Sequence, residues 1–355
     1  MAAVDKLTPT DPRVEHHTAA LNGKKYHYLL GNPPANTPKN GTILLVHGFP
    51  DLSLGWRYQV PYLLSLGLRV IVPDMPGYGR TDSPQDIAAY AFKSVCADLA
   101  ALVAHVRSAD PQPTTDQKIF LGGHDWGGAV VWRFALWHPD LLKGVFSICT
   151  PYWPPSTPGQ PYVPRAQLIK TVLPNFAYQE VLAGPDVEAQ IVGREKIKQF
   201  LRAMYGGRGP NKEVGFTTAQ GPVYENLSLL GPSPLLSSDE FEFYADQFAQ
   251  NDGGSFRGPL NWYRTHKVNF EDELELSTGG GKKIAVPALM VAASKDAALP
   301  PAMSARMDAY FGNLARGEVN TSHWALWEAP AQVNEYIGSF VAGILKDEQA
   351  PKASI

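Results

Sequence analysis

Four short, continuously apolar runs constrain the fold of this chain more than any other feature of its sequence. They lie at residues 42–46, 69–72, 118–121 and 144–149. An unbroken apolar run of this length is typical of a strand covered on both faces, whereas a strand with one wet face alternates apolar and polar residues. Segments with helical spacing separate the runs. Alternation of buried strands with helices predicts a parallel sheet with right-handed crossovers.

The alternation is interrupted by a long segment that begins after Thr150. It contains helical stretches, many aromatic residues and Pro/Gly loops, but no clear buried strand. We therefore predict a core of residues 1–150 and 282–355, with a mainly helical lid segment, residues 151–281, inserted into it. Ligands of such sheets bind at the carboxyl ends of the strands, where the lid segment leaves the core. After the lid the pattern resumes, with strands predicted at 284–291 and 317–319 and helices at 303–311 and 332–345.

An acidic residue stands at the turn between one predicted strand and the helix that follows it. The turn reads Gly123-His-Asp-Trp-Gly-Gly128. A glycine-flanked residue between strand and helix is typical of the nucleophile elbow, a sharp turn that pushes one side chain into a pocket. With Asp125 at its tip, the predicted nucleophile is a carboxylate, which attacks saturated carbon and forms an ester. The absence of G-x-S-x-G at this turn argues against a serine esterase.

Two further residues complete a predicted catalytic triad. Asp296 follows a predicted strand that ends at Ala293, and His323 follows a short strand that ends at Val319. The chain order of nucleophile, acid and histidine is that of α/β-hydrolases. All three residues follow strand ends on the same rim of the sheet. We therefore expect the three side chains to meet.

Two backbone amides are expected to form an oxyanion hole. One belongs to Trp126, the residue after the predicted nucleophile. We assign the other to Phe49, in the segment His47-Gly-Phe-Pro50 that follows the first buried strand. A proline at position 50 in so tight a loop also suggests a cis peptide bond.

Short motifs recur along most of the chain: His47-Gly-Phe-Pro50, Asp74-Met-Pro-Gly-Tyr-Gly-Arg80, Gly123-His-Asp-Trp-Gly-Gly128, Phe256-Arg-Gly-Pro-Leu-Asn-Trp-Tyr-Arg264, Val286-Pro-Ala-Leu-Met-Val291, Lys295-Asp296 and His323-Trp324. Together these motifs resemble soluble epoxide hydrolases of the α/β-hydrolase superfamily, without the phosphatase domain that some members carry. The aspartate elbow alone would be shared with haloalkane dehalogenases, and the motif that begins at Phe256 is the one specific to epoxide hydrolases. The resemblance implies an α/β-hydrolase fold, with a mostly parallel central sheet flanked by helices and an inserted, mainly helical lid.

The resemblance implies that two lid tyrosines donate protons. It places one at Tyr263 and the other at Tyr178. Opening an epoxide expels an alkoxide, and a phenol with a pKa of about 10 relieves much of that cost. The implied reaction converts an epoxide to a vicinal diol through an ester on Asp125, which a water activated by His323 hydrolyses while Asp296 orients the histidine. Five other lid tyrosines could pack or line the pocket: Tyr152, Tyr162, Tyr205, Tyr224 and Tyr244.

Two other functions remain open from the sequence. A haloalkane dehalogenase would share the triad but would need halide-holding donors in place of the tyrosines. A non-catalytic small-molecule receptor could use the same fold, although the triad argues against it. For any of these functions, the candidates for an apolar pocket wall are Tyr152, Trp153, Leu299 and Trp324. Core packing of these residues is an equal alternative, since pockets and cores use the same residue types.

Composition and net charge exclude several classes of binding partner. The net charge is −3 and the basic residues are scattered, so neither nucleic acid nor an anionic membrane is expected as a partner. No apolar run approaches the roughly 18 residues of a membrane span. The sequence has no CxxC, no HExxH and no Cys/His cluster, which predicts no metal and no cofactor. The expected partners are a small apolar epoxide and water, and the expected assembly is a monomer or a homodimer.

The two ends of the chain and its cysteines indicate a cellular compartment. The N-terminus lacks an apolar signal core, and the C-terminal Ala-Ser-Ile differs from a peroxisomal tripeptide, so we expect a cytoplasmic protein. Cys96 and Cys149 are interpreted as small buried residues in a reducing compartment. His16, His17 and His27 fall in a predicted edge-strand pair, where we expect them to be solvated.

Overall fold

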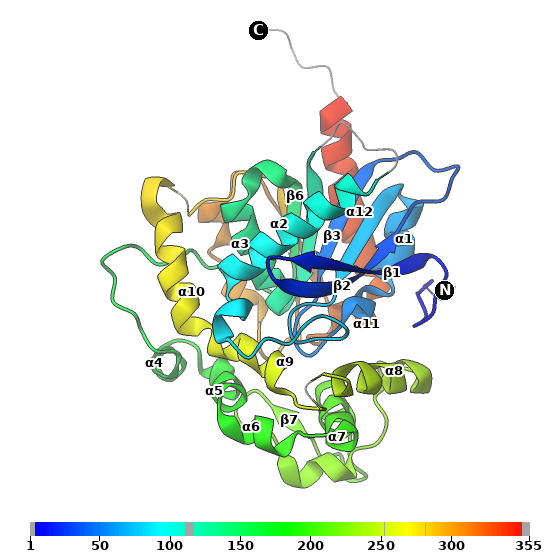
Figure 1. Ribbon diagram of the computed structural model, residues 1–355. Helices are drawn as coiled ribbons and strands as arrows, with labels where there is room; N and C mark the ends of the chain where they lie inside the picture. Colours follow the sequence, from blue (N-terminus) through cyan, green and yellow to red (C-terminus); the bar gives the residue numbers. More distant parts are fainter. Residues whose placement is uncertain (1–3, 111–116, 252, 281, 350–355) are drawn as a thin grey trace.

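A computed structural model describes residues 4–110, 117–251, 253–280 and 282–349 of the chain (Figure 1). At its centre lies an eight-stranded sheet with the order β1-β2-β4-β3-β5-β6-β9-β10. Six neighbouring strands of this sheet run parallel to one another, namely β4, β3, β5, β6, β9 and β10. Strand β2 pairs antiparallel with both β1 and β4. The strands are β1 Val14–Leu21, β2 Lys24–Gly31, β3 Gly41–Val46, β4 Leu68–Pro73, β5 Ile119–His124, β6 Leu142–Ile148, β9 Ala288–Ala293 and β10 Leu314–Val319.

Helices cover both faces of the sheet, as the apolar runs predicted. Helix α3 lies on β5 and β6 and packs against α2, while α12 lies on β6, β9 and β10 and contacts α1. Every residue of β5 and of β6 is buried, which explains why these strands show no alternation. The four helices are α1 Gln59–Ser65, α2 Phe92–Ser108, α3 Trp126–Trp137 and α12 Pro330–Gln349.

The helix predicted at 303–311 is not formed as one element. Two 3-10 turns, Pro301–Ser304 and Met307–Tyr310, take its place. Pro300 and Pro301 lack backbone N–H groups, and the first donors after them, such as that of Met303, bond three residues back instead of four.

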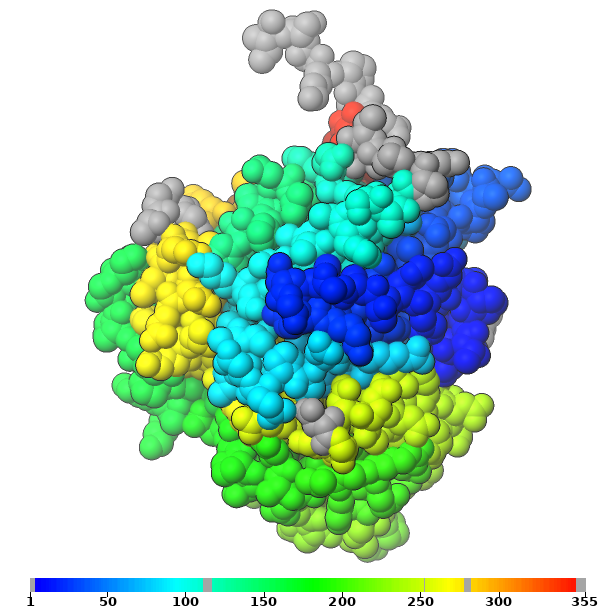
Figure 2. Space-filling view, in the orientation of Figure 1, coloured from blue at the N-terminus to red at the C-terminus, as the bar shows by residue number. Residues whose placement is uncertain are grey.

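Between β6 and β9 the chain forms a mainly helical layer at the carboxyl ends of the strands, drawn in green and yellow in Figure 1. In Figure 2 its surface lies directly against the blue and cyan surface of the core. We keep the name lid segment for residues 151–281, of which residues 252 and 281 lie outside the described residues. Its elements are α4 Arg165–Thr171, α5 Ala177–Ala183, α6 Pro185–Gln190, α7 Arg194–Met204, β7 Phe216–Thr217, β8 Gly221–Pro222, α8 Ser238–Ala249, α9 Arg257–Asn261 and α10 His266–Glu273.

Buried polar side chains of the lid segment tie it to the loop after β3. The Tyr205 hydroxyl donates to the carbonyl oxygen of Pro50 at 2.5 Å. The Tyr244 hydroxyl donates to Oδ1 of Asp51 at 2.8 Å. Both phenols are fully buried, so these bonds are shielded from water and fix the lid segment over this loop.

The histidine at position 27 is buried, so the prediction that it is solvated was wrong. It is 3% exposed, and its Nδ1 lies 2.7 Å from Oδ2 of Asp74. Its Nε2 lies 2.8 Å from Nδ1 of His16. The reason is that β1 covers β2, so β2 is an inner strand. Cys96 and Cys149 are buried and unpaired, as predicted.

Among the described helices, none combines the length and the apolar character that crossing a membrane requires.

The close approach of α3 to β3 gives a stability prediction. A Cβ added at Gly127 would lie 2.1 Å from the carbonyl oxygen of Val46, whereas one added at Gly343 on α12 meets nothing within 4 Å. We expect Gly127→Ala to lower the free energy of unfolding by about 1–3 kcal/mol through overpacking. We expect the control Gly343→Ala to leave it unchanged or raise it by about 0.5–1 kcal/mol through helix propensity. Urea unfolding measures both, and equal effects would contradict the packing of α3.

Candidate active site

Asp125 occupies a strained turn between β5 and α3. Its φ is 54° and its ψ is −124°, a backbone conformation that residues other than glycine rarely adopt. The turn is tight, because a Cβ at Gly123 would lie 2.2 Å from the carbonyl oxygen of Gly127. The conformation directs the Asp125 side chain away from α3 and toward the loop after β3. This is the elbow geometry that the sequence predicted.

The loop after β3 presents a backbone amide to this carboxylate. The N–H of Phe49 donates to Oδ1 of Asp125 at 2.7 Å. The peptide bond between Phe49 and Pro50 is cis, as the sequence suggested. Trp126 is the first residue of α3, so its N–H has no acceptor within the helix and is free for a ligand. Both predicted oxyanion-hole residues therefore flank Asp125.

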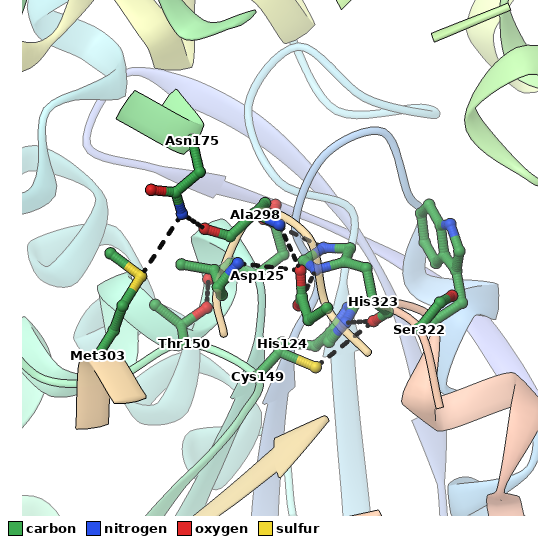
Figure 3. A network of polar contacts seen from close by, with 12 residues as sticks. His124, Asp125, Cys149, Thr150, Asn175, Ala298, Met303, Ser322 and His323 are labelled. Atoms are coloured by element: carbon green, nitrogen blue, oxygen red, sulfur yellow. Dashed lines mark hydrogen bonds and ion pairs between the residues drawn. The ribbon is translucent and has the colours of Figure 1, made fainter. Parts of the chain in front are cut away.

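The triad side chains meet at the carboxyl end of the sheet, where Figure 3 shows Asp125 and His323. Nε2 of His323 lies 3.3 Å from Oδ2 of Asp125, and Nδ1 of His323 lies 2.6 Å from Oδ2 of Asp296. Oδ1 of Asp296 accepts the backbone N–H groups of Ala298 at 2.9 Å and Leu299 at 3.0 Å. The histidine thus bridges two carboxylates, one of them fixed by the backbone that follows β9.

Burial and nearby charges have opposite effects on the protonation of His323 and Asp296. Burial by itself lowers the pKa of His323, but the charge of Asp296 and hydrogen bonds to Asp125 and Asp296 outweigh it and hold the pKa well above its usual 6.5. Burial by itself raises the pKa of Asp296, but His323 and the two backbone N–H groups lower it to about 2. The free protein therefore favours an aspartate–imidazolium pair beside Asp125.

Two residues without a predicted role hold the backbone of His323. Its carbonyl oxygen accepts from Nε2 of His124 at 2.8 Å and from the Cys149 thiol at 3.4 Å (Figure 3). Burial lowers the pKa of His124 to about 4, so it is neutral near pH 7. Among the described residues, one group of side chains has ligand atoms close enough together to hold a metal ion. It consists of His124, Cys149 and His323, whose ligand atoms lie within 4.8 Å of one another.

The two predicted tyrosines lie above Asp125 on different lid elements. Tyr178 is on α5, and Tyr263 is on the 3-10 turn Trp262–Arg264. Their ring centroids are 6.1 Å apart, and the Tyr263 ring lies 4.9 Å from that of Phe49. Burial raises the pKa of both phenols, and the charge of Asp125 adds to the shift, so both keep their protons.

Four of the other lid tyrosines have structural partners instead. Tyr152 donates to the carbonyl oxygen of Lys282 at 2.5 Å, and Tyr162 contacts Nδ1 of His266 at 2.9 Å. Tyr205 and Tyr244 hold the loop after β3, as described above.

Two cavities meet at Asp125 and Tyr178. The wide arm, about 560 Å³, is lined by both tyrosines, the triad, Phe49 and Trp324, with a rim of charged residues. The aromatic arm, about 330 Å³, is lined mostly by aromatic and aliphatic side chains. Among the predicted wall residues, Trp324 lines the wide arm and Trp153 and Leu299 line the aromatic arm. Tyr152 lines neither, because its ring packs between Trp132 and Phe311.

Comparison with known proteins identifies the family. The family model of the alpha/beta hydrolase fold matches residues 41–330. A curated relative from Neurospora crassa, named epoxide hydrolase srdG, is 41% identical over 357 residues, which cover 96% of this chain and 99% of the relative. The chain belongs to the epoxide hydrolases of the α/β-hydrolase family. The family and the fold class predicted from the sequence are thus confirmed.

Other epoxide hydrolases extend the comparison. Bifunctional epoxide hydrolase 2 of Mus musculus is 35% identical over 93% of this chain, and the chain spans 56% of that protein's length. The crystal structure of epoxide hydrolase A from Mycobacterium thermoresistibile matches with a TM-score of 0.74 and 26% identity, covering 93% of this chain and 98% of that one. These relatives favour the epoxide hydrolase interpretation over the dehalogenase and the receptor.

The raised pKa of His323 predicts a pH-dependent contribution to stability. Its pKa in the folded state lies above the unfolded value of about 6.5, so protonation of His323 stabilises the fold. The contribution is complete below about pH 6.5 and is lost as pH rises through the folded-state pKa. In urea unfolding, we expect the stability advantage of the wild type over His323→Gln to shrink as pH rises from 6 to 10. An advantage that grows with pH would contradict the assignment.

Proposed function

We propose that this protein hydrolyses epoxides to vicinal diols through a covalent ester on Asp125. The observation that carries the proposal is the set of groups around this one carboxylate. One oxygen faces His323 and the other accepts the N–H of Phe49, while two buried phenols line the same cavity. A carboxylate nucleophile beside proton donors is suited to displacement at an epoxide carbon. The 41% identical relative named an epoxide hydrolase supports the same conclusion.

In the first step Asp125 attacks one epoxide carbon and the bond from that carbon to the ring oxygen breaks. The developing alkoxide takes a proton from Tyr178 or Tyr263, while the other phenol donates a hydrogen bond. In the same surroundings a phenol is a stronger acid than an alcohol, because the reference pKa values are about 10 for tyrosine and 15.7 for water. The products are a hydroxyalkyl ester on Asp125 and a tyrosinate held in a buried site.

In the second step His323 acts as a general base. The ester has no charge, so one of the effects that hold the proton on His323 disappears. His323 then releases this proton to solvent, which leaves a neutral imidazole, and it takes a proton up again once the ester is gone. The neutral imidazole takes a proton from water, which attacks the carbonyl carbon of Asp125, and the amides of Phe49 and Trp126 hold the oxyanion. Collapse expels the diol oxygen, which takes the proton from His323. The second water proton restores the tyrosine.

We propose that the lid segment, residues 151–281, encloses the substrate and that the substrate is a small apolar epoxide. The mostly aromatic and aliphatic lining of the aromatic arm supports this, because such pockets bind apolar groups while a few polar groups orient them. We also propose a cytoplasmic location. Two buried cysteines that remain as thiols are typical of a protein in a reducing compartment.

A single turnover in ¹⁸O-labelled water tests the ester. With enzyme in excess, we expect the label in the carboxyl group of Asp125 and not in the first diol, because water attacks the carbonyl carbon of the ester. Mass spectrometry of the peptide that contains Asp125 measures it. His323→Gln should accumulate the ester, since its base is missing. Label in the first diol would show direct attack of water on the epoxide and would overturn the proposal.

Loss of one phenol should slow ring opening. We expect Tyr263→Phe to lower kcat by about 10²–10⁴, the usual contribution of a general acid. Tyr224→Phe is the matched control, because Tyr224 is a lid tyrosine that lines neither arm. Steady-state hydrolysis of an aryl epoxide measures both variants. Comparable losses in the two would remove Tyr263 from the mechanism.

A further inference from the structure

Arg165 of the lid segment connects the elements that carry the two tyrosines. Arg165 begins α4, and its Nη1 donates to the backbone carbonyl oxygen of Tyr263. Its Nε donates to Oε1 of Glu180 at 2.6 Å. Glu180 lies on α5, two residues after Tyr178. One guanidinium therefore spans the backbone of one tyrosine and the helix of the other.

A second arginine makes the same connection at the other end of α5. Nε of Arg264, the residue after Tyr263, donates to the carbonyl oxygen of Ala183 at 3.0 Å. Its Nη2 donates to the carbonyl oxygen of Gly184 at 3.2 Å and lies 2.8 Å from Oε2 of Glu188. Ala183 is the last residue of α5, so these bonds also satisfy carbonyl groups that the helix leaves free.

These two attachments matter because the lid elements that they join are short. Helix α5 spans only Ala177–Ala183, and no residue of α4 is buried. Helices this short are not stable alone and take their position from tertiary contacts. The side chains of Arg165 and Arg264 are 11% and 12% exposed, so both guanidinium groups are largely shielded from water, whereas the Glu180 carboxylate that Arg165 binds is 42% exposed. Because its guanidinium is planar and rigid, an arginine fixes the direction of its hydrogen bonds as well as their length.

We infer that Arg165 and Arg264 are positioning residues that hold Tyr178 and Tyr263 at the separation needed to bind one epoxide oxygen together. This inference rests on the proposed function. Proton donors act efficiently only when they are held close to the productive geometry, and a displacement of about 1 Å can cost about 10²-fold in rate. Neither arginine contacts the triad through a described hydrogen bond or ion pair, so its loss should affect ring opening and spare hydrolysis of the ester.

Single-turnover kinetics separate the two steps. We expect Arg165→Gln to slow ester formation by about 10- to 100-fold and to leave the rate of ester hydrolysis within about twofold of wild type. Arg264→Gln should act on the same step. Arg194→Gln is the matched control: Arg194 is a lid arginine that binds two partners, Glu242 and Asp246, and, unlike Arg165, lines neither arm. It should leave both rates unchanged.

Two further variants distinguish position from charge and from misfolding. Arg165→Lys keeps the charge but cannot span both partners, so it should slow ester formation as Arg165→Gln does. Glu180→Gln weakens one contact at a half-exposed site and should slow the same step by less. In a Tyr263→Phe background, Arg165→Gln should add little, because residues that act as a unit are not additive.

Two outcomes would overturn the inference. One is an Arg165→Lys enzyme with wild-type ester formation, and the other is an equal slowing of both steps by Arg165→Gln and Arg264→Gln. Failure of the proposed function would look different, since the wild-type enzyme itself would then form no ester. Thermal unfolding of each variant shows that the measured rates belong to folded protein.

Discussion

Asp125 keeps a backbone conformation that costs a residue with a side chain about 1–3 kcal/mol, and contacts from separate elements hold it there. The hydroxyl of Thr150, just after β6, donates to its carbonyl oxygen at 2.7 Å, and the N–H of Phe49, after β3, donates to its side chain. The adjacent glycine backbones leave room for this geometry. The rest of the active site is arranged around the direction in which this residue points.

The lid segment completes the site from the opposite side, and buried polar contacts fix its height above the sheet. Phenols of Tyr205 and Tyr244 bind the loop that supplies the Phe49 amide. The same loop therefore receives the lid and touches the nucleophile. Because these hydrogen bonds are buried, breaking them exposes unsatisfied groups, which makes the relative position of lid and core energetically well defined.

The residues that follow strand ends could be predicted from the sequence because the carboxyl ends of parallel strands meet at one edge. From this rule the sequence alone predicts that Asp125, Asp296 and His323 lie together. The support from His124 and Cys149 could not be predicted, since it depends on a backbone carbonyl far along the chain. Burial of His27 was missed because strand order, and not sequence, decides which strand is covered.

The two arms have a stereochemical consequence. An elongated molecule can be threaded past Asp125 in either direction, and reversal of the molecule offers the other ring carbon to the carboxylate. Because the arms differ in size, about 560 Å³ against about 330 Å³, a bulky substituent sorts to one side. Under the proposed mechanism, the carbon that Asp125 attacks sets the handedness of the alcohol centres, so reshaping either arm is a way to change that handedness without touching the groups at the breaking bond.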